Sequence, residues 1–116
     1  MTPNVPFAEG VAAAQAGRPV AECPYDCTAQ GGAAKAWAEG WAASIVAQFE
    51  SARTAQGAAA AAPFHVKLQW HQGWTWTERW AVRALYGAVP LKVAADVIGR
   101  TSGAVHRAYH RSEGVA

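Results

Sequence analysis

The sequence predicts a mainly α-helical protein, in which a two-helix hairpin is followed by a three-helix helix-turn-helix. Two observations support this fold class. Apolar residues recur at helical spacing on both sides of an alanine run at 58–62, and glycine or proline separates the helical segments from one another. The chain of 116 residues is long enough for one compact domain or for two small ones.

The first half predicts two helices joined by a loop. Residues 7–17 form an amphipathic pattern that ends at a glycine suited to a helix C-cap. Residues 21–32 are expected to form a loop, because they contain a proline and end in two glycines. The second helix begins near residue 33, and an apolar stripe runs along it. The residues of this stripe are Trp37, Trp41, Ile45 and Phe49.

A domain boundary is predicted at the alanine run. We expect a module at 1–56, a linker at 57–63 and a second module at 64–116, although the high helix propensity of alanine also allows the second helix to continue to Pro63. The first module carries three Lys or Arg and five Asp or Glu, a net charge of −2. From Pro63 onwards there are seven basic and three acidic residues, a net charge of +4, and all four histidines. If the protein has a polyanionic partner, it therefore belongs to the second module.

Residues 64–71 alternate apolar and polar side chains, which is typical of an extended strand with one buried face. A single strand leaves the hydrogen-bonding groups along its edges unpaired. The pattern is therefore either a strand-like arm that pairs with its copy in a homodimer or an accident of a short window.

Three short helices are predicted after this arm. The first begins with Thr75 or Thr77 as N-cap, and a glutamate follows in its first turn, where a carboxylate suits the helix dipole. The second helix starts at a proline and stops at Gly99, and the third runs over 101–111. Short helices joined by tight turns are the pattern of a helix-turn-helix.

The third of these helices predicts a DNA-binding face. Its small apolar residues fall on one side, and its long polar residues fall on the other. A small residue near the helix start permits close approach to a major groove, where Arg and His side chains reach base edges. Basic residues near helix ends are suited to phosphates. The candidate DNA contacts are Lys92, Arg100, Thr101, Ser102, Gly103, His106, Arg107, His110 and Arg111.

The second half also carries a family-like pattern, which consists of a Trp-Thr start, a leucine before the first turn, an apolar second helix ending in Ile-Gly, and Ala-Val at the start of the third helix. The positions are Trp76, Thr77, Arg79, Leu85, Val93, Ala94, Ile98, Gly99, Ala104, Val105, His110 and Arg111. This pattern resembles the Myb-like helix-turn-helix of the GcrA cell-cycle regulator type. The resemblance implies binding to double-stranded DNA.

A different pattern marks the first half, where spaced glycines precede a Cys-Pro-Tyr stretch and a later Trp-x-x-Gly-Trp. The positions are Gly10, Ala13, Gly17, Arg18, Cys23, Pro24, Tyr25, Trp37, Gly40 and Trp41. They resemble the ribosome modulation factor family, whose members are small two-helix proteins that bind ribosomal RNA. The resemblance implies contact with RNA, or a retained scaffold for protein contact or dimerisation. The candidate contact residues are Arg18, Tyr25, Lys35, Trp37 and Trp41.

Other site chemistry is not indicated. No nucleophile has a recognisable base beside it, and no glycine-rich phosphate loop follows a strand, so we expect neither an enzyme nor a cofactor. Cys23 and Cys27 lack the tighter spacing usual in zinc sites, so free thiols are expected instead of a metal centre. The tryptophans at 70–80 are expected in the core, with stacking on single-stranded bases as the alternative.

Together these features favour a sequence-specific DNA-binding transcriptional regulator that acts as a homodimer, since one recognition helix reads few base pairs. The alternatives are a ribosome- or RNA-associated factor and a small adaptor that modulates a host protein complex. A cytoplasmic location is expected, because the sequence has neither a membrane-spanning apolar run nor a secretion signal. Two unrelated small modules in one chain also suggest a phage or mobile-element origin.

Overall fold

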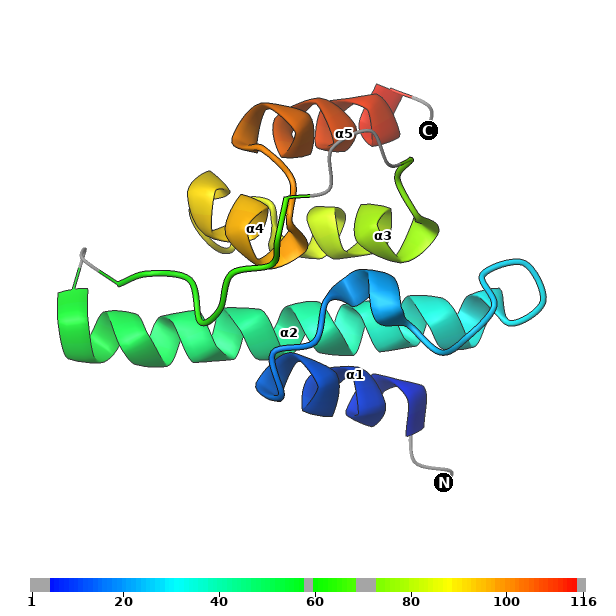
Figure 1. Ribbon diagram of the computed structural model, residues 1–116, viewed down its shortest axis with the longest axis horizontal. Helices are drawn as coiled ribbons and strands as arrows, with labels where there is room; N and C mark the ends of the chain where they lie inside the picture. The colour runs from blue at the N-terminus through cyan, green and yellow to red at the C-terminus, as the bar shows by residue number, and fades with distance from the viewer. Residues whose placement is uncertain (1–4, 58–59, 69–72, 115–116) are drawn as a thin grey trace.

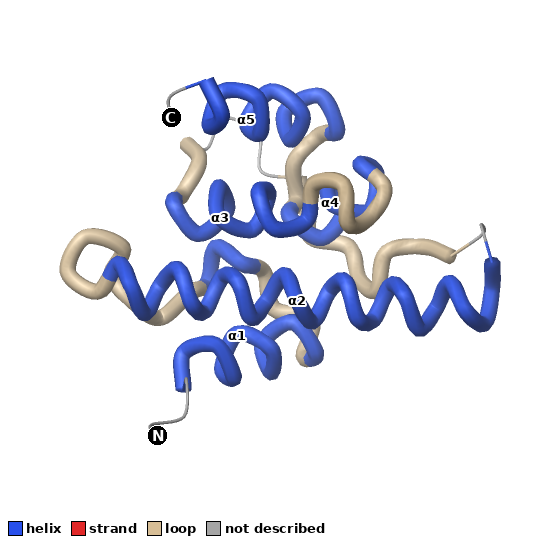
Figure 2. Tube along the Cα trace, turned by 180° about the vertical axis from the view of Figure 1, so that it is seen from behind, coloured by secondary structure: helices blue, strands red, loops and turns tan. Residues whose placement is uncertain are grey.

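The computed structural model describes residues 5–57, 60–68 and 73–114, and side chains as far as His110. It confirms the mainly α-helical fold, since the described residues form helices and no sheet (Figure 2). The long helix α2 crosses the middle of the molecule, with α1 on one side and α3 and α4 on the other, and α5 lies on the far side of α3 and α4 (Figure 1). The elements are α1 (Val5–Gln15), η1 (Val20–Glu22), α2 (Gly31–Gln56), α3 (Trp76–Leu85), α4 (Leu91–Ile98) and α5 (Ser102–Gly114).

Helices α1 and α2 are in backbone contact where they cross, and two glycines make that contact possible. A Cβ atom added to Gly10 would lie 2.0 Å from the carbonyl oxygen of Trp37. A Cβ atom added to Gly40 would lie 2.1 Å from the carbonyl oxygen of Phe7. Each glycine therefore faces the backbone of the opposite helix, which no larger residue could approach as closely.

The connection between α1 and α2 is more ordered than the predicted loop. Its first part forms the 3-10 turn η1, which buries Val20 completely. The indole Nε1 of Trp41 donates a hydrogen bond of 2.8 Å to the carbonyl oxygen of Arg18, just before this turn. In the later part, the carboxylate of Asp26 accepts hydrogen bonds from the backbone N–H groups of Thr28 and Ala29. The connection is thus fixed to α2 and also stabilised locally.

The segment after α2 decides between alternatives that the sequence left open at two points. Helix α2 ends at Gln56, and Gly57 has a φ of 67°, so residues 60–63 do not continue the helix towards the proline. The possible strand at 64–71 is not formed over 64–68, and 69–71 lie outside the described residues. Instead, the segment runs as an extended strap between α2 and α4 (Figure 2).

The alternation in this strap nevertheless reflects real burial over residues 64–67, beyond which Leu68 is 43 % exposed. Phe64 and Val66 are half-buried, whereas His65 and Lys67 are exposed. The ring of Phe64 meets the edge of Trp41 at a centroid distance of 6.2 Å. The backbone N–H of Val66 donates a hydrogen bond of 2.8 Å to the carbonyl oxygen of Asp96. Packing against α2 and α4 therefore replaces pairing in a sheet.

The boundaries of the three C-terminal helices follow the predicted caps. Thr75 is the N-cap of α3, where it forms a reciprocal capping box with Glu78. Gly99 ends α4 in the left-handed conformation, with a φ of 84°. The hydroxyl of Thr101 accepts a hydrogen bond of 3.2 Å from the backbone N–H of Ala104 and so caps α5.

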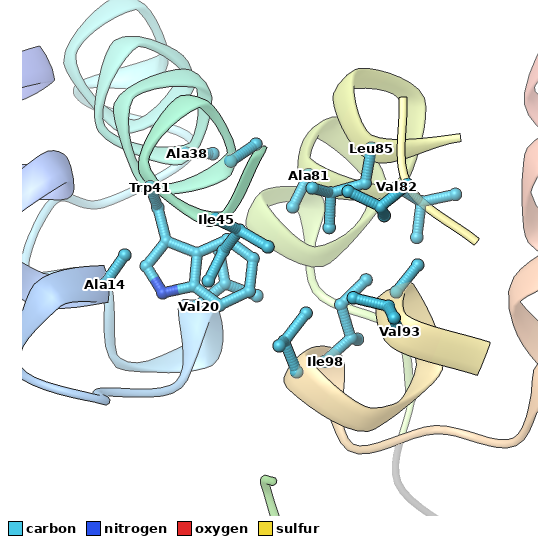
Figure 3. Close-up of a cluster of buried hydrophobic side chains, with 14 of the residues drawn as sticks. Ala14, Val20, Ala38, Trp41, Ile45, Ala81, Val82, Leu85, Val93 and Ile98 are labelled. Carbon is cyan, nitrogen blue, oxygen red and sulfur yellow. The ribbon is translucent and has the colours of Figure 1, made fainter. Parts of the chain in front are cut away.

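One hydrophobic cluster joins both halves of the chain. Ile45 extends from α2 towards Ala81 of α3, whereas Trp41 lies beside Ala14 and Val20 (Figure 3). The labelled cluster consists of Ala14, Val20, Ala38, Trp41, Ile45, Ala81, Val82, Leu85, Val93 and Ile98. The division into modules at 1–56 and 64–116 remains a prediction about folding units, since two units that fold separately can still share a packed surface.

Candidate nucleic-acid interface

Helix α5 is anchored by Val105 and Tyr109, which pack in or against the common core. Val105 is fully buried and joins the common core, whereas the opposite side of the helix is exposed. Among the residues of α5 up to His110, the exposed ones are Gly103, His106, Arg107 and His110. The predicted outward face is therefore present, and α5 lies at the outer edge of the molecule (Figure 1).

Arg107 lies directly over the small residue at the start of this face. A Cβ atom added to Gly103 would lie 3.3 Å from a terminal guanidinium nitrogen of Arg107. This nitrogen is at the far end of a flexible side chain. The glycine thus leaves room for the arginine, and the guanidinium remains exposed. A guanidinium of this kind can contact phosphate oxygens or base edges in two places at once.

The two histidines of α5 belong to an aromatic cluster that the sequence did not indicate. The rings of Tyr86 and Tyr109 stack at a centroid distance of 3.9 Å with an interplanar angle of 5°. The hydroxyl of Tyr86 lies 3.0 Å from Nδ1 of His106. The ring centroids of His106 and His110 lie 4.4 Å apart. Tyr86 follows α3, so this contact spans 20 residues and no local pattern could have revealed it.

The prediction that Arg100 contacts phosphate needs correction. Its side chain is 6 % exposed, and its Nε lies 2.9 Å from Oε2 of Glu78. It also donates to the carbonyl oxygen of Gly73 at 2.9 Å, and its guanidinium lies 4.7 Å from the ring centroid of Trp74. Arg100 therefore ties the start of α3 to the turn between α4 and α5, and it is not part of the outer surface.

The remaining predicted contacts of the second half differ in accessibility. The side chain of Lys92 is 83 % exposed, and its Nζ lies 3.6 Å from Oδ2 of Asp96. The same oxygen lies 3.5 Å from Nδ1 of His65. Thr101 and Ser102 are half-buried at the start of α5. The side chain of Arg111 lies outside the described residues.

The predicted contacts of the first half divide into two groups. Trp37 and Trp41 are 3 % and 0 % exposed, so the prediction that they contact a partner is wrong, and they act as core residues. Arg18 and Lys35 are exposed. Tyr25 is half-buried and donates a hydrogen bond to the carboxylate of Glu9, which raises the pKa of the tyrosine.

Other kinds of site find little support among the described residues. No three His, Cys, Asp or Glu side chains in that part of the chain gather as metal ligands. Cys23 and Cys27 are half-buried free thiols, and burial raises the pKa of Cys23. None of the helices within the described ranges is long and apolar enough to span a bilayer.

Comparison with known proteins bears on the first half alone. No curated protein and no solved structure is significantly similar to the chain. DNA binding, the Myb-like resemblance, dimerisation and a phage origin therefore stay predictions. The model of the family described as ribosome modulation factor matches residues 3–45, which include α1, η1 and the first part of α2, so the N-terminal part of this chain is similar to that family.

Proposed function

We propose that this protein is a ribosome-associated factor that attaches to ribosomal RNA. The observation that carries the proposal is the position of the family match at 3–45. The matched range contains the contacts of a packed unit formed by α1, η1 and the first part of α2, and these contacts are Gly10, Trp37, Gly40 and Trp41. The similarity therefore extends to the residues that maintain this unit.

Charge favours RNA contact through the second half of the chain. The first half is net acidic, and Arg53, one of its three basic residues, lies 4.0 Å from Glu50. The basic residues are concentrated after Pro63, and several of them are exposed on α3, α4 and α5. In this proposal the α1–α2 unit is the scaffold, and the helices on its other side carry the positive charge that RNA requires.

The direct test is cosedimentation of the full-length protein with purified ribosomes at about 0.1 M and about 0.3 M salt. Association that weakens with salt is the expected result. The full chain is required, because removal of residues 63–116 would expose the α2 side chains that pack on α3. A protein that stays in the supernatant at both salt concentrations would contradict the proposal.

A second candidate function is DNA binding through α5, and the observation that favours it is the exposed face containing Gly103, Arg107 and His110. On this hypothesis Arg107 reads base edges, and Lys92 contacts phosphate. Arg107→Ala should then lower affinity and relax sequence preference, whereas Lys92→Ala should weaken binding to all sequences alike. A binding assay with a pool of genomic fragments tests this, and equal losses on every fragment from both variants would argue against base readout.

A further inference from the structure

One side of helix α3 carries two tryptophans and two arginines, of which one of each is exposed and one half-buried. The residues are Trp76, Arg79, Trp80 and Arg83, and their spacing of three, four and seven residues puts them on one side of the helix. The opposite side of α3 carries the residues buried in the core, among them Ala81, Val82 and Leu85. We call the first set the Trp–Arg stripe.

The stripe is more exposed than packing alone would require. Trp76 is 56 % exposed, and Trp80 is half-buried against the core. The two indole rings lie 6.0 Å apart at an interplanar angle of 32°. The guanidinium of Arg79 lies 5.2 Å from the ring centroid of Trp76. A large aromatic ring thus remains open to solvent beside a cation, in an arrangement that gains little for the stability of the monomer.

The charge of the stripe is not neutralised within the described part of the chain. No ion pair joins Arg79 or Arg83 to a carboxylate among the described side chains. The nearest carboxylate in the sequence, that of Glu78, is fully buried and held by Arg100. The stripe therefore combines an open π surface with uncompensated positive charge.

Unpaired nucleotides have the complementary chemistry. Their base faces are free to stack on an aromatic ring, and a phosphate lies within a few ångströms of each base. A duplex hides its base faces, and an acidic peptide supplies charge without a flat ring. We infer that the Trp–Arg stripe binds unpaired nucleotides of RNA, with a base stacked on Trp76 and a phosphate bound by Arg83. This inference rests on the proposed association with ribosomal RNA and specifies which part of the RNA is bound.

The experiment titrates the full-length protein with an unstructured RNA of about a dozen nucleotides over a series of salt concentrations. Trp76→Ala should weaken binding by about tenfold without changing the salt dependence, and Trp76→Phe should restore most of the affinity. Arg83→Gln should reduce the slope of log K against log salt by about 0.7, the value for one phosphate contact on single-stranded nucleic acid. The matched control is Arg53→Gln, which removes an exposed arginine from α2 and should leave both quantities unchanged.

Several outcomes would overturn the inference. They are wild-type affinity and salt slope in both stripe variants, an equal loss in the Arg53→Gln control, and tighter binding to an RNA hairpin than to the unstructured RNA. Thermal unfolding of each variant confirms that it is folded, as expected for residues with exposed side chains.

Cosedimentation of the same variants with ribosomes separates the inference from the proposed function. If the stripe variants lost ribosome association but still bound naked RNA normally, the stripe would contact a ribosomal protein. RNA binding by the stripe would then be overturned. If all variants associated with ribosomes as the wild type does, RNA binding by the stripe would be overturned, and the proposed function would stand. Trp76-dependent RNA binding by a protein that does not sediment with ribosomes would support the stripe and contradict the proposed function.

Discussion

The α1–α2 pair and the α3–α5 group solve the problem of packing helices in different ways. The first pair relies on glycine, which brings two backbones into contact along helices of 11 and 26 residues. The second group has helices of 10, 8 and 13 residues, and it relies on caps, a left-handed glycine and a buried ion pair. Short helices have more unsatisfied backbone groups per residue, so polar interactions at their ends matter more.

The largest effect on stability is expected at the buried ion pair of the α3–α5 group. Glu78→Ala should lower the free energy of unfolding by about 3–5 kcal/mol, because Arg100 would remain buried without its partner. The capping box of α3 would be lost as well. Urea unfolding followed by circular dichroism measures this, with Glu50→Ala as the control for an exposed ion pair that should change stability by less than about 0.5 kcal/mol. The double variant Glu78→Gln/Arg100→Met should lose less than the sum of its single changes, and strictly additive losses would contradict a direct coupling.

The next effect tests the backbone contact in the first pair. Gly10→Ala should cost about 2–3 kcal/mol, because the added Cβ forces α1 away from the carbonyl oxygen of Trp37. Gly32→Ala is the matched control, since nothing lies within 4 Å of its added Cβ and alanine favours the helix. Thermal unfolding of both variants makes the comparison. Equal destabilisation by the two changes would mean that close approach is not what the glycine provides.

A smaller effect is expected from the aromatic cluster that joins α3 to α5. Tyr86→Ala removes the stack on Tyr109 and should cost about 1 kcal/mol. Tyr86→Phe retains the stack and loses only the contact with His106, so its cost should stay below about 0.5 kcal/mol. Chemical denaturation measures both values. If the phenylalanine variant were the more damaged of the two, the hydrogen bond and not the stack would hold the cluster together.

The smallest effect concerns the loop before α2 and depends on pH. The hydroxyl of Thr28 and the backbone N–H groups of Thr28 and Ala29 lower the pKa of Asp26. This carboxylate therefore contributes stability above the unfolded pKa of about 3.9, and the contribution is lost as the pH falls through the lower pKa of the folded state. Asp26→Ala should lower the melting temperature slightly at about pH 6 and not at about pH 2. A difference in melting temperature that is the same at both pH values would contradict this account.

The candidate interface was predictable in part. Helical periodicity alone identified Gly103, His106, Arg107 and His110 as the outer face of α5, and all four are exposed. The same reasoning failed for Arg100, because its partner Glu78 is 22 residues away and no pattern within a helix turn reveals such a pair. A large charged side chain next to a glycine turn is equally suited to solvent or to a distant carboxylate.

The aromatic residues show the same division. Trp76 falls at a helical position that sequence reasoning assigned to the core, yet its side chain is 56 % exposed. Periodicity placed Trp37 and Trp41 in the apolar stripe of the second helix, and both are buried, whereas the family resemblance offered them as contact residues, which is wrong. Periodicity identifies which residues share a face of a helix, but not whether another element covers that face.

The sequence by itself determined the caps of the three C-terminal helices. Thr75, Gly99 and Thr101 act within one helix turn of their own position, so the local sequence is enough to predict their effects. Only the tertiary structure decided which faces are covered, that residues 64–68 form a strap instead of a strand, and that Arg100 pairs with Glu78. Which helix faces are covered and which charges pair depends on which distant elements come together. That arrangement is determined by the burial of the apolar surface of the whole chain.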